Sequence, residues 1–448
     1  MQNNQYCYLK KAHGNRIIGA LAISSLLLVV TGCDNTIRNH RTPDVTDTII
    51  HNQPTINNQT PPIEVKALTS TPEDIAEVVT ANNQFAIDMY QQINGQNKQT
   101  EKNVFFSPYS LSTAMAMLYA AAEGETKAQI QKTFHYPAPA ILNPNSATLY
   151  NDFNKPNPDY KLATVNDLWL QQGLTPTKSY IDTVQRYYSG QVTALDFVSR
   201  PEPSRQTINK TIAKNTRQLI PELLPKGSIK SDTAMVLTNA VYFKGDWTLP
   251  FTAERTSAQS FYNAIGRAST VQMMQQQSYF SYYEDKHIEV VQLPYKGDNL
   301  SMLVVLPKLN HKLAMQQLAK SLSATKLKQW SSGLVRQEVN LHLPKFKLDA
   351  RYQMKTLLAD MGMPRAFHDV AEFNLYADGP HIKLDEVYHQ AVVTVDEKGT
   401  EAAAAAGAVG MYVGMSYPVE FKADHPFMFM IKDNKTDAIL FLGQVNQP

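Results

Sequence analysis

Cysteine is almost absent from this 448-residue chain. Its two cysteines, Cys7 and Cys33, both lie near the N-terminus, so the rest of the chain holds neither a thiol nor a disulfide. A body of this kind is compatible with any redox compartment. The absence also excludes a cysteine nucleophile, and any zinc site built on thiolates, from the body of the protein.

The short motifs of common enzyme and nucleotide sites are also missing. The sequence has no Gly-x-Ser-x-Gly, no His-Glu-x-x-His, no phosphate-binding loop and no dinucleotide fingerprint. The histidines of the body are scattered, without the spacing of metal ligands. We therefore expect no enzyme activity, no metal and no cofactor, although Ser, His and Asp all occur and composition alone leaves a catalytic triad open.

Long runs of like charge are absent. The 42 Lys and Arg residues nearly balance 40 Asp and Glu residues, which gives a net charge of +2. This balance provides no electrostatic reason to expect nucleic acid as a partner. Hydrophobic residues make up 43% of the chain, which is ordinary for a globular protein and enough for a large core.

The N-terminal segment has the order of a secretory signal. Positive charges at Lys10, Lys11 and Arg16 precede an apolar run at residues 17–30. The next residues complete Val-Thr-Gly-Cys, which resembles the lipobox of bacterial lipoproteins, where the cysteine, here Cys33, is diacylated and becomes the first mature residue. Two acyl chains give stable membrane attachment. The alternatives are a plain signal peptide and an uncleaved anchor, but a transmembrane helix needs roughly 20 apolar residues.

We therefore predict three regions. Residues 1–32 form a lipoprotein signal peptide, residues 33–72 a lipidated flexible tether, and residues 73–448 the folded domain. The tether is rich in Asn, Thr, Gln and Pro, and its few apolar residues cannot bury enough surface to order it. The expected location is a bacterial membrane, on the periplasmic face or the cell surface, with the protein held by its lipid.

The body combines helical and strand patterns. Residues 73–90 carry apolar residues at helical spacing, and a second helix is expected after Ser107, a good N-cap, and Pro108. Further helices are expected at 313–322 and 352–361, and strands at 234–243, 288–293, 300–306, 339–343, 391–395, 427–431 and 439–445. Because helices come mostly first and strands mostly later, the pattern indicates an α+β fold.

An alanine-rich stretch, residues 402–406, is the most informative segment. By propensity alone it is a helix, because alanine is the best helix former. However, Gly407, Gly410 and Gly414 interrupt such a helix, and the stretch follows a β-branched strand. As a strand, one of its faces carries only small side chains from residue 400 to residue 410. Small inward side chains suit a strand that must enter a finished, close-packed sheet.

Several motifs resemble the serpin family. Residues 393–404, Val-Thr-Val-Asp-Glu-Lys-Gly-Thr-Glu-Ala-Ala-Ala, are similar to a strand of the serpin central sheet and the hinge of its reactive loop. Similar matches, in the family's order, occur at 106–112, 124–126, 238–247, 250–251, 421–427, 433–436 and 440–443. The resemblance runs from about residue 73 to the end of the chain.

The resemblance implies helices packed on three β-sheets, with an exposed reactive loop at about residues 399–418. It implies a suicide inhibitor of a serine-type protease, with a cysteine-type protease as the alternative, whose cleaved loop inserts into the central sheet. The family's spacing gives a reactive bond between Val413 and Gly414, and a small shift would select Met411, Tyr412 or Met415. Val413 suits elastase-like or subtilisin-like proteases, whereas Tyr412 or Met415 would suit chymotrypsin-like ones.

The resemblance also assigns residues to named regions. The hinge comprises Glu397, Gly399, Thr400, Glu401, Ala402, Ala403 and Ala404. The shutter, where strands of the central sheet must part, comprises Ser107, Ser110, Asn239 and His389. Trp247 and Glu397 match the breach, where the loop first enters.

Two other functions are open. A non-inhibitory serpin that acts as a carrier or chaperone usually has bulky, charged or proline residues in its hinge, whereas Thr400 and the alanines are intact here. A hydrolase on a similar scaffold has no motif in its support. Ala406 stands where inhibitory members often have Thr, but it is equally small. We expect a monomer.

Overall fold

A computed structural model describes residues 70–96, 102–311, 313–376, 382–399 and 417–448. The predicted signal peptide and almost all of the predicted tether lie outside the described residues. The first described helix, α1, spans Pro72–Gln96. None of the described helices is both long enough and apolar enough to cross a membrane.

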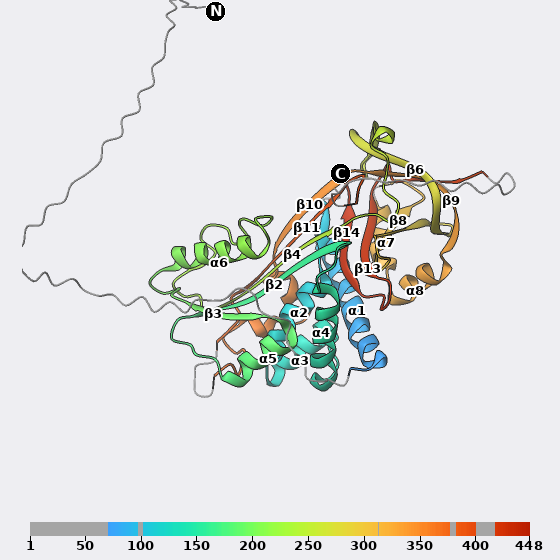
Figure 1. Cartoon of the computed structure of the whole chain (residues 1–448). Coiled ribbons are helices and arrows are strands. Elements are labelled where there is room, and N and C mark those ends of the chain that lie inside the picture. Colours follow the sequence, from blue (N-terminus) through green and yellow to red (C-terminus); the bar gives the residue numbers. More distant parts are fainter. Residues whose placement is uncertain (1–69, 97–101, 312, 377–381, 400–416) are drawn as a thin grey trace, which may run out of the picture. The chain divides into compact units, whose positions relative to one another are not determined.

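Helices from the first half of the chain form one layer of the domain (Figure 1). They pack against one another and comprise α1, α2 (Pro108–Tyr119), α3 (Gly124–Phe134), α4 (Pro139–Asn154) and α5 (Lys178–Tyr188). Helix α2 starts as predicted, because the Ser107 hydroxyl accepts a hydrogen bond from the Ser110 N–H at 3.1 Å and Pro108 occupies the first turn. Helix α2 is buried along nearly its whole length, with contacts to both sheets.

A five-stranded sheet lies over this helical layer. Its strand order is β10-β11-β4-β2-β3, with bounds Phe346–Gln353, Glu386–Val395, Met235–Gly245, Tyr160–Gln171 and Gln191–Leu195. The central pair, β11 and β4, is parallel, and its register runs from Glu386 opposite Val236 to Val392 opposite Tyr242. We call this ladder the seam. The flanking ladders, β10 with β11 and β2 with β4, are antiparallel.

The remaining strands form a nine-stranded sheet. Its main path is β1-β14-β13-β8-β7-β6-β9-β12, and β5 pairs with β6. The bounds in that order are Val104–Phe106, Ile439–Val445, Phe427–Asp433, Leu300–Pro307, Ile288–Pro294, Ala268–Glu284, Val335–Pro344 and Val419–Lys422, with β5 at Ser257–Tyr262. Two of the three expected sheets are thus joined, because the long strand β6 pairs with β9 through most of its length and with β7 at its end.

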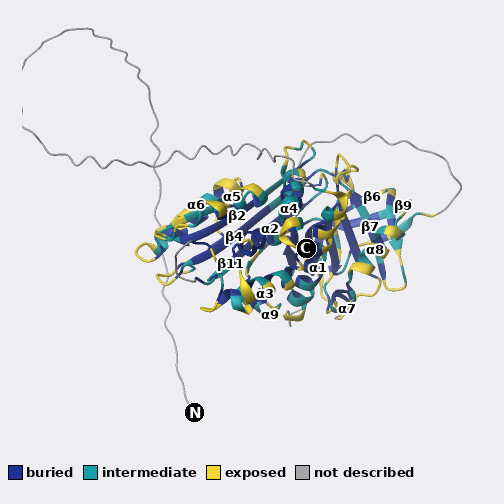
Figure 2. Cartoon of the chain, turned by 90° about the horizontal axis from the view of Figure 1, so that it is seen from below, coloured by how far each residue is buried: buried dark blue, intermediate teal, exposed yellow. Residues whose placement is uncertain are grey.

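Helix α6 (Pro201–Asn215) covers the other face of the five-stranded sheet. Its Ile208 and Ile212 pack in a buried cluster with Val165 and Trp169 of β2 and Tyr388 of β11. Figure 2 shows the dark blue buried strands beneath this helix.

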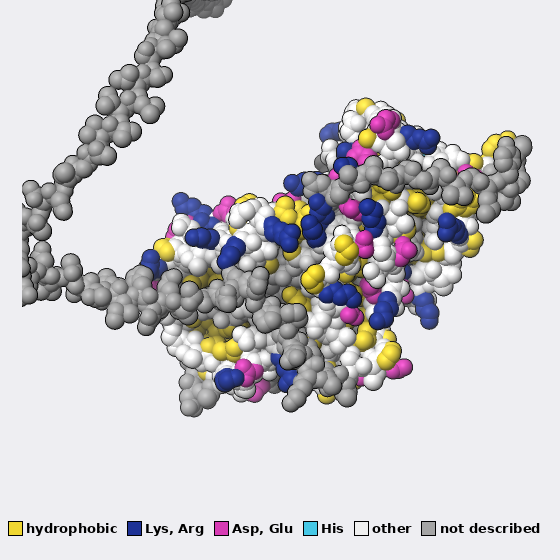
Figure 3. Space-filling view, viewed as in Figure 1, with side chains coloured by type: hydrophobic (Ala, Val, Ile, Leu, Met, Phe, Trp, Pro, Cys, Tyr) yellow, Lys and Arg dark blue, Asp and Glu magenta, His cyan; other side chains and the backbone are white. Residues whose placement is uncertain are grey.

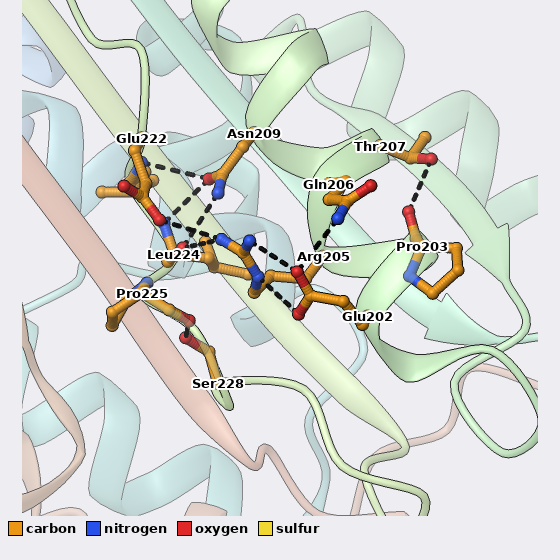
Figure 4. A network of polar contacts seen from close by, with 11 residues as sticks. Glu202, Pro203, Arg205, Gln206, Thr207, Asn209, Glu222, Leu224, Pro225 and Ser228 are labelled. Atoms are coloured by element: carbon orange, nitrogen blue, oxygen red, sulfur yellow. Dashed lines mark hydrogen bonds and ion pairs between the residues drawn. The ribbon is translucent and has the colours of Figure 1, made fainter.

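A polar network fixes α6 to the segment that follows it (Figure 4). The Arg205 guanidinium donates to the Glu202 carboxylate at 2.7 and 2.9 Å, to Glu222 at 3.0 Å and to the Leu224 carbonyl at 2.7 Å. Asn209 both donates to that carbonyl and accepts from the Leu223 and Leu224 N–H groups. The helix is therefore braced over the sheet and does not rest on apolar packing alone.

The last elements complete the domain. Helices α7 (Ala314–Ser321) and α8 (Ala324–Gly333) lie beside the nine-stranded sheet, and α9 spans Lys355–Asp360. Two short 3-10 turns occur at Ala253–Arg255 and Pro364–Phe367. Charges of both signs are interspersed on the face shown in Figure 3, in keeping with the small net charge.

All seven predicted strands are present, although β11 begins at Glu386 and not at 391, and β9 begins at Val335 and not at 339. The turn between β13 and β14 lies at Asn434–Thr436. The helix predicted at 352–361 is wrong at its start. Tyr352 and Gln353 belong to the edge strand β10, and α9 begins at Lys355. Pairing with β11 decides this, because Tyr352 stands opposite His389 in the antiparallel ladder.

Candidate functional site

The structure brings the four predicted shutter residues together at the seam. Asn239 of β4 and His389 of β11 stand opposite each other in the parallel ladder, and the His389 Nδ1 lies 2.5 Å from the Asn239 Oδ1. The Asn239 amide nitrogen donates to the Ser110 hydroxyl at 2.6 Å and carbonyl at 3.1 Å. The Ser107 N–H donates to the His389 Nε2 at 3.1 Å.

These contacts fix the protonation state of His389. Because Nε2 accepts from a backbone N–H, the proton of the neutral ring is on Nδ1, where it is donated to Asn239. The side chain is fully buried, and burial lowers the pKa of His389 to about 3. A neutral imidazole therefore cross-links the middle of the seam and is shared between β11, β4 and the start of α2.

Asn166 is a fifth member of this network that the motif comparison did not identify. It lies on β2, opposite Asn239 in the antiparallel ladder, and its Oδ1 is 2.5 Å from the Asn239 amide nitrogen. Three adjacent strands, β2, β4 and β11, thus each contribute one buried polar side chain. The available signal was a pair of adjacent polar residues, Asn166 and Asp167, between the apolar Val165 and Leu168 of the strand.

Asp167 lies on the opposite face of β2, because side chains alternate along a strand. It shares that face with Val165 and Trp169, beneath α6. The residue is 2% exposed, and its Oδ2 has no hydrogen-bond partner among the described residues. Burial raises the pKa of the Asp167 carboxyl to about 7. A titratable group is therefore enclosed between the sheet and its covering helix.

The breach residue Trp247 lies just beyond the end of β4. Its ring is 1% exposed and stacks on Tyr295, with ring centroids 4.5 Å apart. Its Nε1–H donates to the Asp396 carbonyl at 3.1 Å, and its backbone N–H donates to the Lys398 carbonyl at 2.9 Å. Trp247 therefore connects the segments that follow the C-terminal ends of β4 and β11.

A tight turn follows β11 and ends at the hinge glycine. Asp396 and Gly399 exchange two backbone hydrogen bonds, at 3.1 and 3.2 Å. Gly399 has φ +119°, and a Cβ built on it would lie 2.3 Å from the Gly245 carbonyl oxygen and 2.6 Å from the Trp247 nitrogen. Both the dihedral angle and the close backbone approach therefore require glycine at this position.

Glu397 anchors the same turn. Its carboxylate accepts from the Lys345 ammonium at 2.8 Å and from the Thr256 hydroxyl at 2.9 Å, and its carbonyl accepts from the Phe251 N–H at 2.7 Å. Burial acts to raise the pKa of the Glu397 carboxyl, but these hydrogen bonds and the Lys345 charge outweigh it and lower the pKa. The carboxylate is thus held in its charged form.

Other predicted site residues lie outside the described residues. They are Cys33, Thr400, Glu401, Ala402, Ala403, Ala404, Val413 and Gly414. The described chain resumes at Tyr417 and enters β12, which pairs in parallel with β9. No cluster of three or more His, Cys, Asp or Glu side chains suited to a metal occurs in the part of the chain that the structure describes.

Residues 80–448 match a protein-family model described as "Serpin (serine protease inhibitor)". This chain belongs to the serpin family. An uncharacterized serpin-like protein of Methanosarcina mazei is 40% identical over 378 residues, which cover 83% of this chain and 88% of that protein. A leukocyte elastase inhibitor of Xenopus laevis is 38% identical over 370 residues, or 81% of this chain and 97% of that protein.

Solved structures confirm the serpin fold. Uncleaved ovalbumin has a TM-score of 0.75 and 27% identity, and the match covers 83% of this chain and 100% of that one. Human thyroxine-binding globulin in complex with its hormone has a TM-score of 0.76 and 29% identity, with 84% and 99% covered. The family is one of serine protease inhibitors by its description, yet it includes a protein named for hormone binding.

Proposed function

We propose that this serpin is a single-use protease inhibitor that inserts its cleaved reactive loop into the seam. The observation that carries the proposal is the position of Gly399. It forms antiparallel bridges with Asp246, just beyond β4, and with Asp396, just beyond β11. A strand that continues from Gly399 between β4 and β11 would therefore begin in register with both neighbours and antiparallel to both.

That register assigns partners to the loop. Asn239 lies seven residues before Asp246, and His389 lies seven residues before Asp396, so the residue seven beyond Gly399 meets both at the shutter. This residue is Ala406. Alternate loop residues share its face, and all of them are small: Thr400, Ala402, Ala404, Ala408 and Gly410. The shutter face is buried, so bulk there would cost stability.

Insertion would also improve the pairing of the backbone. The seam is a parallel ladder, which is slightly less stable per residue than an antiparallel one. A strand placed between β4 and β11 replaces this single ladder with two antiparallel ladders. Because small side chains bury little apolar surface, the new backbone hydrogen bonds supply most of the gain.

The chemistry is that of an interrupted proteolysis. The protease serine attacks the Val413 carbonyl, the bond to Gly414 breaks, and an acyl-enzyme forms with Gly414 as the released amine. Insertion then carries the attached protease away and distorts its active site, so water does not complete the hydrolysis. The aliphatic Val413 favours elastase-like or subtilisin-like targets, and the resemblance to a leukocyte elastase inhibitor supports this choice.

Carrier function is the second candidate, because thyroxine-binding globulin has a similar fold. The small hinge residues favour the inhibitor. We also propose, from the sequence, that Cys33 carries the lipid that holds the protein on a bacterial membrane.

The test is to mix the purified domain with elastase and analyse the products on a denaturing gel. An inhibitor gives a covalent band at the summed mass, a carrier is only cleaved, and a hydrolase turns over added substrate without being consumed. The mass of the released C-terminal peptide identifies the reactive bond. Parallel reactions with subtilisin, chymotrypsin and a papain-like protease separate the target classes.

A further inference from the structure

A cavity of about 270 Å³ lies away from the seam, between helices α7 and α8 and two loops of the nine-stranded sheet. One loop is the β6–β7 turn at residues 285–287, and the other follows Pro307, the last residue of β8, and contributes Leu309 and His311. None of the hinge, shutter or breach residues lines this cavity. Loop insertion therefore does not account for it.

The base of the cavity is apolar. Trp330, Ile288, Leu318 and Ala314 line it and are each at most 9% exposed. Leu309 lines the cavity as well but is 70% exposed, so apolar surface continues outward from the buried residues. An indole with aliphatic neighbours and an open apolar edge is typical of a site for a small hydrophobic group.

The polar lining is mostly cationic or basic. Lys286, His287, His311 and Lys326 all line the cavity, and none of them forms an ion pair with another described residue. The one carboxylate in the lining belongs to Asp285. It accepts hydrogen bonds from the backbone N–H groups of His287 and Ile288, at 2.7 and 3.0 Å.

The nearest acidic neighbour in the chain, Glu284, is also engaged, because it is paired with Lys308 at 2.5 Å. Two lysine ammonium groups, of Lys286 and Lys326, thus stand against the single carboxylate of Asp285 in the described lining, which leaves an excess of positive charge. Such an arrangement is complementary to an anion that also carries an apolar part.

We propose that this cavity binds a small amphipathic carboxylate. The apolar tail or ring packs on Trp330 and Leu318, and the carboxylate lies among Lys286, His311 and Lys326. The volume is at the lower end of that of ligand pockets, so the ligand is a short-chain or single-ring acid and not a steroid-sized one. This site adds ligand binding to the protein and is independent of the proposed inhibition.

Calorimetric titration with octanoate, and with 1-octanol as a neutral ligand of equal chain length, tests the site. Octanoate is expected to bind once per chain and at least ten-fold more tightly than 1-octanol. Lys326→Gln combined with His311→Gln should remove that ten-fold preference and leave 1-octanol binding unchanged. Lys320→Gln changes an exposed lysine of α7 outside the lining, so it is the matched control and should behave as wild type.

A filled cavity gives the second test. Ala314→Leu places extra carbon atoms in the cavity and should weaken both ligands at least ten-fold. The double variant at Lys326 and His311 changes only polar lining residues. It therefore still tests the proposal if Ala314→Leu does not fold. Equal affinity for octanoate and 1-octanol, or octanoate binding that neither variant changes, overturns the proposal. Elastase trapping is measured separately and is unaffected by either result.

Discussion

A hydrogen bond of 2.5 Å joins the His389 Nδ1 to the Asn239 Oδ1, across the two strands that the proposed mechanism must separate. The bond lies at the middle of the seam, with three paired residues on either side of it. Opening the sheet therefore requires this buried bond to break and its groups to find new partners. A neutral ring can do so without exposing a charge, because its pKa is already low.

The first prediction concerns pH. The pKa of His389 is about 3 in the folded protein, whereas an unfolded histidine titrates near 6.5. The unfolded state binds more protons below pH 6.5, so the contribution to stability is complete above about pH 6.5 and is lost as pH falls toward 3. The loss reaches about 1.4 kcal/mol per pH unit. His389→Gln should reduce this slope in thermal unfolding between pH 4 and 7, and an unchanged slope would contradict the assignment.

The second prediction has the opposite sign. The pKa of Asp167 is raised to about 7 in the folded protein, from an unfolded value near 3.9. Its contribution to stability is therefore complete below about pH 4 and is lost as pH rises through 7. Asp167→Asn should raise the melting temperature at pH 8 and change it little at pH 4. The exposed Asp232→Asn is the control, and an equal effect of both variants at pH 8 would refute the role of burial.

The third prediction separates steric clash from backbone strain. Gly399→Ala should lower the free energy of unfolding by about 2 kcal/mol or more, because its methyl group would overlap with the Gly245 and Trp247 backbone. Gly227→Ala is the matched control, since it also has positive φ but open space around it. Chemical denaturation of the two variants tests this. Equal losses would show that the close approach at Gly399 has no energetic importance.

The fourth prediction concerns the faces of the loop. Thr400→Arg places bulk on the face that would meet the core, so we expect cleavage by elastase without a covalent complex. Glu401→Met puts a comparably long side chain on the opposite face and should still trap the protease. Gel analysis and melting of the cleaved forms are the measurements. Trapping by Thr400→Arg at the wild-type level would rule out insertion in the proposed register.

The fifth prediction concerns attachment. Cys33→Ser removes the proposed acylated thiol, so the exported protein should move from the membrane fraction to the soluble fraction. The wild-type protein should carry a mass increment from its acyl chains, measured by intact mass spectrometry. Membrane retention of the serine variant would indicate a different anchor.

Residue chemistry and motif resemblance together located the shutter but not its full extent. Ser107, Ser110, Asn239 and His389 lie in long matching motifs, and Ser107 also fits an N-cap. Asn166 was missed because polar residues inside a strand do not by themselves show which residues they contact. Its role depends on the register that places it beside Asn239.

Strand β6 and the end of strand β10 were not predicted from the sequence, for a similar reason. Strand β6 contains Gln275, Gln276 and Gln277 in succession, so its sequence lacks a clean apolar alternation. It forms a strand because two neighbours, β7 and β9, pair with its backbone. Tyr352 likewise fits a helical pattern by sequence and becomes a strand residue through pairing with β11. Pairing between strands that are distant in sequence determines the strand conformation of these segments. A short stretch of sequence carries no information about that pairing.

The antiparallel bridges of Gly399 also bear on the stoichiometry of the proposed inhibition. In the proposed mechanism, each inhibition event replaces the parallel ladder of the seam with two antiparallel ladders. The cleaved molecule does not return to its uncleaved form. The amount of protease that can be inhibited then scales with the number of unused copies, not with how fast any copy works. The rate of synthesis then limits the inhibitory capacity, and protease in excess of the unused copies would remain active.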